Sequence, residues 1–156
     1  IRATIEAGCL AEELGTIESI RAEVAYGKNR RSRIDLLLTP AADNPDQRPI
    51  YVEVKNTTLA EGELARFPDA VTTRGRRHLE HLMARRKRGE RVALLYIVQR
   101  ADADVVAPAD DIDPEYGRTL REAANSGVEL YALSARVLGD RIRVERALPI
   151  DLSLDA

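Results

Sequence analysis

Apolar and polar residues follow two different periods along this chain, and these periods predict the order of its helices and strands. Apolar spacings of three and four residues predict helices at residues 2–14, from a cap at Thr72 or Thr73 to about residue 88, and at 114–126. Alternating or continuous apolar runs predict strands at 19–25, 34–39, 50–56, 91–99, 128–136 and 141–145. Helices interleaved with strands in this order predict an α/β fold, a mixed sheet flanked by helices.

Glycines and prolines separate these segments in the way expected of helix ends and turns. Gly15, Gly89 and Gly127 each follow a predicted helix, and the last helix begins at Asp113-Pro114. The first three strands are close in sequence, which favours an antiparallel meander. Residues 57–71 and 101–113 show no clear period and are expected to be connections, the first anchored to the core by Phe67. We find no repeat or linker, so one domain over residues 1–156 is expected.

Three ionisable residues interrupt the second and third strands. Asp35 lies in Ile-Asp-Leu-Leu-Leu, and Glu53 and Lys55 lie in Val-Glu-Val-Lys. Side chains two apart in a strand share a face, so Glu53 and Lys55 point the same way. One interpretation is a solvent-facing or ion-paired pattern. The other is a divalent-metal site in which Asp35 and Glu53 bind the ion and Lys55 acts on the attacking water and the phosphate.

Composition narrows the cellular and chemical context. The 156 residues are 44% hydrophobic, enough for one compact core. The single cysteine, Cys9, excludes an internal disulfide, and with only two histidines it also excludes a zinc site. No apolar run approaches the ~18 residues of a membrane span, so a cytoplasmic soluble protein with no membrane partner is expected. The chain begins at Ile1, which predicts that an upstream part is missing.

The net charge of −2 is the sum of a net positive charge over residues 1–91 and a larger net negative charge over residues 92–156. Positive residues cluster at 28–33 and at 74–91. Such clusters are either solvated faces or a local phosphate-binding surface. Arg74 at a helix start suits either reading. His78 and His81 have either a structural or a catalytic role, and Tyr116 is expected to pack beneath the acidic loop.

Several motifs in the same order resemble a known family. The order αβββαβ, with Asp on one strand and Glu-x-Lys on the next, resembles the core of the PD-(D/E)XK nuclease superfamily. More closely, Tyr-Gly-Lys-Asn with Ser-Arg-Ile-Asp, Tyr-Val-Glu-Val-Lys-Asn-Thr-Thr-Leu, Phe-Pro-Asp-Ala-Val-Thr-Thr-Arg-Gly-Arg-Arg-His-Leu and Ile-Asp-Pro-Glu-Tyr-Gly are similar to the sugar fermentation stimulation protein family. The similarity spans nearly the whole chain.

The resemblance implies a restriction-endonuclease-like core and a set of roles. Members of that family pair a nuclease-like domain with an N-terminal OB-like domain and are described as DNA-binding, and the OB-like domain is expected to be absent from residues 1–156. The resemblance puts Asp35, Glu53 and Lys55 at the catalytic positions, the two carboxylates at the metal, with Mg²⁺ or Mn²⁺ as cofactor. The further candidates it suggests for this site are a glutamate (Glu6, Glu12 or Glu13 of the first helix, or Glu23 of the first strand) and Gln99.

Two functions follow, with DNA as the partner in both. The first is a DNA-binding protein with a metal-dependent nuclease-like site, hydrolysing phosphodiesters. The second is a non-catalytic DNA-binding regulator of sugar metabolism genes that keeps the nuclease scaffold. The residues expected to contact nucleic acid are Lys28, Arg31, Arg33, Arg74 and His78. A third reading leaves DNA binding to the missing domain, and the oligomeric state stays open, a homodimer included.

Overall fold

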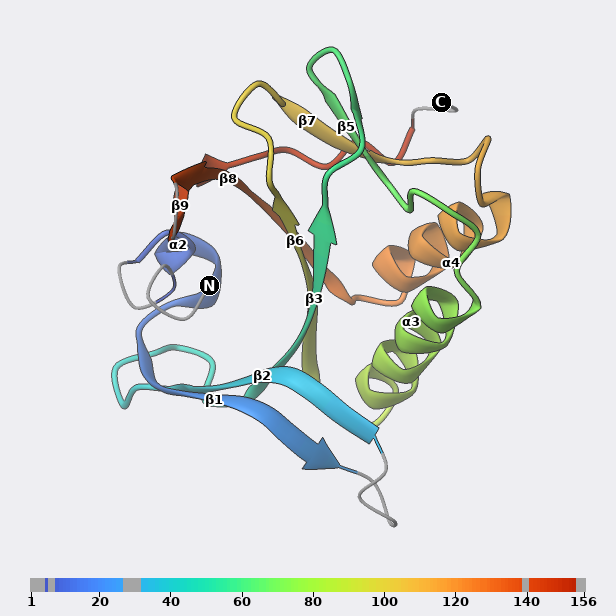
Figure 1. Cartoon of the computed structure of the whole chain (residues 1–156). Helices are drawn as coiled ribbons and strands as arrows, with labels where there is room; N and C mark the ends of the chain where they lie inside the picture. Colours follow the sequence, from blue (N-terminus) through green and yellow to red (C-terminus); the bar gives the residue numbers. More distant parts are fainter. Residues whose placement is uncertain (1–4, 6–7, 27–31, 139–140, 154–156) are drawn as a thin grey trace.

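A six-stranded mixed sheet forms the centre of the computed structural model, which describes residues 5, 8–26, 32–138 and 141–153. Its strands lie in the order β1-β2-β3-β6-β8-β9 (Figure 1). Their bounds are β1 Ile17–Tyr26, β2 Ser32–Pro40, β3 Ile50–Thr57, β6 Arg91–Val98, β8 Glu129–Leu138 and β9 Arg141–Ala147. The first three strands pair antiparallel, β3, β6 and β8 run parallel, and β9 closes the sheet antiparallel. The predicted meander and mixed α/β fold are confirmed.

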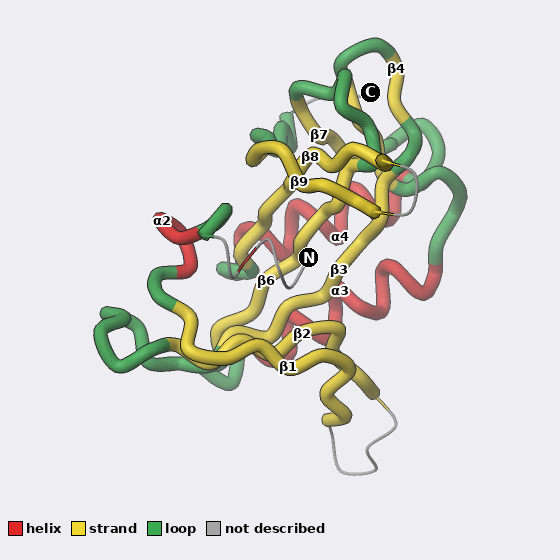
Figure 2. The backbone as a smooth tube through the Cα atoms, turned by 60° about the vertical axis from the view of Figure 1, so that its left-hand side comes forward, coloured by secondary structure: helices red, strands yellow, loops and turns green. Residues whose placement is uncertain are grey.

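Helices cover the two faces of this sheet unequally. α3 (Thr73–Arg86) and α4 (Pro114–Asn125) lie on one side, and the short α2 (Ala11–Leu14) lies on the other (Figures 1 and 2). All eight residues of β6 are buried, because this strand is covered on both faces. Leu94 and Tyr96 of β6 pack with the α3 and α4 side, whereas Leu95 packs with the α2 side. The sheet therefore separates two hydrophobic clusters. Residues of β3 alternate between them in the same way, with Tyr51 on the α3 side and Val52 on the α2 side.

The starts of α3 and α4 are tied together by their capping residues. Thr72 caps α3, its Oγ1 accepting a hydrogen bond from the Gly75 amide at 3.0 Å. Asp113 caps α4 by accepting from the Tyr116 amide at 3.0 Å, and its other oxygen accepts from the Thr72 amide at 2.8 Å. These caps agree with the sequence prediction. One carboxylate thus fixes the N-termini of both helices relative to each other.

Two stretches differ from the sequence prediction. A three-stranded second sheet, β4 (Ala60–Glu61), β5 (Leu64–Phe67) and β7 (Val105–Pro108), stands where only connections were expected. Strands of two to four residues are too short to show a period, and β5 pairs with a partner distant in sequence. The helix expected at residues 2–14 is also interrupted, because Gly8 has φ of +83° and leaves α2 only its last turn.

No helix in the described part of the chain combines the length and the apolar composition needed to cross a membrane.

Candidate active site

The end of the β2–β3 pairing brings the predicted carboxylates next to each other. Leu36 pairs with Val52 at the limit of the ladder, and Asp35 and Glu53 are the next residue on each strand. Side chains alternate along a strand, so Glu53 faces away from Val52, whereas Asp35 is located by its own contact with β3. Asp35 is exposed, and its Oδ2 accepts a hydrogen bond from the Val54 amide at 2.7 Å. One side of the Asp35 carboxylate is therefore anchored to β3.

Glu53 is the buried member of the site. Its side chain is only 7% exposed, and its Oε1 accepts a hydrogen bond from Lys55 Nζ at 2.9 Å. His78 of α3 contacts the same oxygen through Nδ1. Burial works to raise the pKa of Glu53, but the hydrogen bonds from His78 and Lys55 together outweigh it, so the pKa lies below its ordinary value. Glu53 is held as a carboxylate inside the protein.

His78 joins this cluster, whereas the sequence left its role open between a structural, a catalytic and a nucleic-acid-contacting one. Its Nδ1 lies 3.0 Å from Lys55 Nζ, and its Nε2 lies 3.4 Å from the Nε of the exposed Arg74. A sequence signal exists: the buried residues of α3 include Gly75, Leu79 and Leu82, and His78 lies on the edge of that stripe. Sequence alone does not say which strand residue this edge meets.

A tyrosine pair and Phe67 lie in the same hydrophobic cluster on the α3 side of the sheet. Tyr96 and Tyr116 are buried, and their hydroxyls share a hydrogen bond of 2.8 Å. Burial raises the pKa of both phenols, and the charge of Glu53 is a further cause at Tyr116. Phe67 packs on both rings, at centroid distances of 5.5 and 5.2 Å. The predicted packing roles of Phe67 and Tyr116 are confirmed. Because their pKa values are raised, the phenols of Tyr96 and Tyr116 stay uncharged.

Other candidates from the sequence lie away from Glu53. Glu23 and Arg33 form an exposed ion pair of 3.2 Å on the β1–β2 hairpin. Gln99 follows β6, and its backbone N–H donates to the Thr57 carbonyl at 2.9 Å. This pairing lies two residues further along β3 than Lys55. Glu12 and Glu13 are exposed on α2, which packs on the opposite face of the sheet. Lys28, Arg31 and Glu6 lie outside the described residues.

The donor set fits a cation that keeps part of its water shell. Within the described ranges, no three His, Cys, Asp or Glu side chains converge closely enough to form a complete metal cage. Mg²⁺ and similar ions are commonly held by one or two carboxylates, with water and substrate phosphate completing the coordination. Asp35 and Glu53 supply two carboxylates on adjacent strands. The residues therefore fit an open divalent site rather than a closed structural one.

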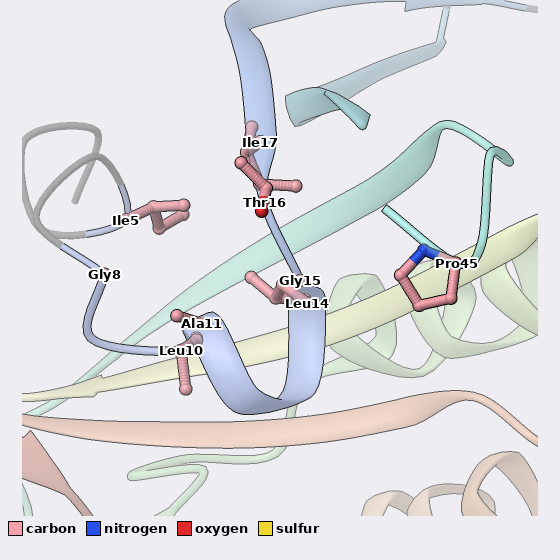
Figure 3. Close-up of a pocket in the computed structure, with 9 residues that line it drawn as sticks. All are labelled: Ile5, Gly8, Leu10, Ala11, Leu14, Gly15, Thr16, Ile17 and Pro45. Atoms are coloured by element: carbon pink, nitrogen blue, oxygen red, sulfur yellow. The ribbon is translucent and has the colours of Figure 1, made fainter. Parts of the chain in front are cut away.

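A separate pocket of about 320 Å³ lies on the α2 side of the sheet (Figure 3). Aliphatic residues such as Leu10, Leu14 and Ile17 line it, together with Thr16 and Pro45. Among the described residues, its lining holds no acidic, basic or imidazole side chain, in contrast to the surroundings of Glu53.

The lowered pKa of Glu53 makes a prediction about stability. A carboxyl group whose pKa falls on folding stabilises the fold above its unfolded pKa, near 4.5, and this stabilisation is lost as the pH drops through the lower folded value. The free-energy advantage of the native protein over Glu53→Gln is therefore expected to shrink as the pH falls from 7 to 3. Urea unfolding at a series of pH values without divalent ions measures this.

The control for this prediction is Glu80→Gln, which removes an exposed carboxylate from α3. An advantage over Glu53→Gln that stays constant across the pH range would contradict the paired, ionised state of Glu53.

The mixed sheet, its flanking helices and the acidic residues at the β2–β3 junction define the class of α/β proteins with a restriction-endonuclease-like core. The family model described as the sugar fermentation stimulation protein RE domain matches residues 1–141. The chain belongs to this family.

Curated relatives and a solved structure agree with this assignment. The chain is 56% identical over 150 residues to the sugar fermentation stimulation protein homolog of Parasynechococcus marenigrum (strain WH8102), covering 96% of this chain and 59% of the relative. It is 59% identical over 149 residues to the homolog of Synechococcus sp. (strain WH7803), covering 96% and 58%. SfsA of Pyrococcus furiosus, solved in complex with Ca²⁺, superposes with a TM-score of 0.80 at 28% identity, covering 96% of this chain and 62% of that chain. The chain thus spans about three fifths of the length of these relatives.

Proposed function

We propose that this chain is a DNA-binding domain with a divalent-metal-dependent phosphodiesterase site. The observation that carries the proposal is the Glu53–Lys55 ion pair on β3, together with Asp35 of the neighbouring β2, whose carboxylate accepts a hydrogen bond from the Val54 amide between them. Two carboxylates and an amine in this arrangement are suited to phosphoryl chemistry. The Ca²⁺ complex of the Pyrococcus furiosus relative supports a divalent site in this family.

Each side chain has a role that follows from its position. Asp35 and Glu53 would hold the ion, which when bound supplies a Lewis acid for the phosphate and the attacking water. Lys55, whose ammonium lies beside Glu53, would orient the water and offset negative charge that builds up on the phosphate. Mg²⁺ and Mn²⁺ both suit these carboxylates. Lys55 belongs to β3, which is paired with β6 on one side, so the backbone position of Lys55 is fixed.

Incubation with single- and double-stranded DNA in Mg²⁺ or Mn²⁺ tests the proposal. Cleavage by the native chain that is abolished by EDTA and by Asp35→Ala is the expected result. No cleavage under any of these conditions, or equal cleavage by Asp35→Ala, removes the enzymatic claim.

One observation favours a second candidate, a DNA-binding domain without turnover. The carboxylate of Glu53 is already paired with Lys55 and His78, and such pairing neutralises the charge that would attract an ion. A regulator of sugar metabolism genes that kept the nuclease scaffold would show this. DNA binding without cleavage, unchanged by Asp35→Ala, supports this candidate.

The exposed basic residues of α3 are proposed to contact DNA phosphates. Arg74 and Arg77 are both exposed on this helix, and Arg74 reaches the His78 ring. Each phosphate that a protein neutralises on duplex DNA makes the slope of log affinity against log salt more negative by about 0.9. Arg77→Ala is therefore expected to make this slope less steep by about 0.9, with weaker binding to all sequences alike. Fluorescence anisotropy at several salt concentrations measures it.

Arg136→Ala is the matched control, because Arg136 is exposed on β8 and pairs with Glu145. Equal slopes for the native chain and both variants would show that α3 does not lie along the DNA backbone.

A further inference from the structure

Val71 is a large apolar side chain that lies open to solvent directly before α3. It is 69% exposed, and Leu138, at 41%, is the other exposed large hydrophobic residue in the described part of the chain. Ala70 is exposed as well, so Ala70 and Val71 together form an apolar tip. Covering an aliphatic side chain that water surrounds is favourable, which makes the apolar tip a candidate contact surface.

The apolar tip is held between two anchored points of the backbone. On one side Pro68 is buried, and Phe67 packs on the buried tyrosine pair. On the other side Thr72 caps α3, and its amide donates to Asp113 at 2.8 Å. An apolar residue before a helix cap often packs back onto the helix, but a side chain that is 69% exposed does not. The backbone therefore presents Val71 outward.

The charges around the apolar tip favour phosphate on α3 and disfavour it at the tip itself. Arg74 and Arg77 are exposed in the first two turns of α3, and the first turn carries no acidic residue. Asp69, exposed on the other side of the tip, would repel a phosphate placed there. A DNA strand whose phosphates lie along α3 therefore meets the tip with an uncharged part, a sugar or a base.

We propose that Val71 packs on an unstacked base of the DNA strand whose phosphates lie on α3, so that this chain prefers single-stranded DNA to closed duplex. The inference rests on the DNA-binding function proposed above. In a duplex the bases are stacked inside, and a helix that lies along the backbone meets phosphate and sugar. In a single strand the bases can turn outward, and side chains that cover their faces then add affinity.

Fluorescence anisotropy in EDTA, which prevents cleavage, tests this contact with three probes: a thymidine oligonucleotide, an abasic oligonucleotide of the same length, and a duplex. Burying much of a valine side chain is worth about 10-fold in affinity, so Val71→Ser is expected to weaken binding of the thymidine probe about 10-fold. The abasic probe and the duplex keep their phosphates but offer no open base. Their affinities are therefore expected to change less than about 2-fold.

Leu138→Ser is the matched control, because it removes an exposed aliphatic side chain from β8. Its affinities for all three probes are expected to equal those of the native chain. Val71→Ser removes no charge, so the salt dependence of its binding is expected to stay that of the native chain, unlike that of Arg77→Ala. Urea unfolding of Val71→Ser checks that this surface change keeps the fold.

The possible outcomes separate this inference from the function on which it rests. Binding of the thymidine probe that Val71→Ser leaves unchanged overturns the inference and leaves the DNA-binding function standing. Equal weakening of the thymidine and abasic probes also overturns it, because Val71 would then contact the backbone. Equal weakening of the thymidine probe and the duplex overturns it as well, since Val71 would then not distinguish open from paired bases. A native chain that binds none of the probes contradicts both.

Discussion

Lys55→Met is expected to reduce metal-dependent DNA cleavage by about 10²–10³-fold, the usual cost of removing one preorganised charge that stabilises a transition state. Methionine keeps much of the length and apolar stem of lysine but has no ammonium group. The Lys55 ammonium contacts both Glu53 and His78, and in the proposed mechanism it would offset the charge that builds up on a bound phosphate. Single-turnover cleavage at saturating DNA measures this loss separately from binding.

Lys87→Met is the matched control for this variant. Lys87 is exposed just past the end of α3, so its loss removes the same charge from a place outside the site. Its cleavage rate at saturating DNA is expected to equal that of the native chain. If Lys55→Met were as active as Lys87→Met, Lys55 would have no part in the chemistry, and its ion pair with Glu53 would be only structural.

Leu94→Ala is expected to lower the free energy of unfolding by about 2–5 kcal/mol, because truncation of a fully buried leucine leaves a cavity. Leu94 is 0% exposed and lies on β6, paired with Glu53 of β3 on one side and Leu130 of β8 on the other. It packs in the hydrophobic cluster beneath α3 and α4. Urea or guanidinium unfolding of the native chain and the variant measures this change.

Val71→Ala provides the comparison, since Val71 is 69% exposed and its truncation is expected to stay within about 0.5 kcal/mol. Equal losses for the two variants would contradict the position of β6 at the centre of the core.

The regular parts of the fold could be predicted because each carries its own local signal. β6 is a continuous apolar run, and α3 and α4 have capping residues and glycines at their ends. The strands β4, β5 and β7 give no such signal, because each has only two to four residues. β5 and β7 are stabilised by pairing between distant segments, such as Ala65 with Val106. The positive φ of Gly8 likewise depends on context, since a glycine is compatible with either path.

From the sequence, the site could be predicted only where strand alternation determines which residues share a face. Alternation puts Glu53 and Lys55 on one face, and the structure agrees through their 2.9 Å contact. The place of Asp35 depends on the register of Leu36 with Val52, which the meander order alone does not fix. The contact of His78 with Glu53 depends on how α3 packs on the sheet. It joins residues 25 positions apart, beyond the reach of any local pattern.

The central claim is that Asp35 and Glu53 hold a divalent cation, and diffraction from a Mn²⁺-soaked crystal at an energy where manganese scatters anomalously tests it most directly. The account predicts an anomalous peak in contact with carboxylate oxygens of both residues, and no peak there in crystals of Asp35→Ala. A site that stays without anomalous density at saturating Mn²⁺, with the Lys55 ammonium still bound to Glu53, would contradict it.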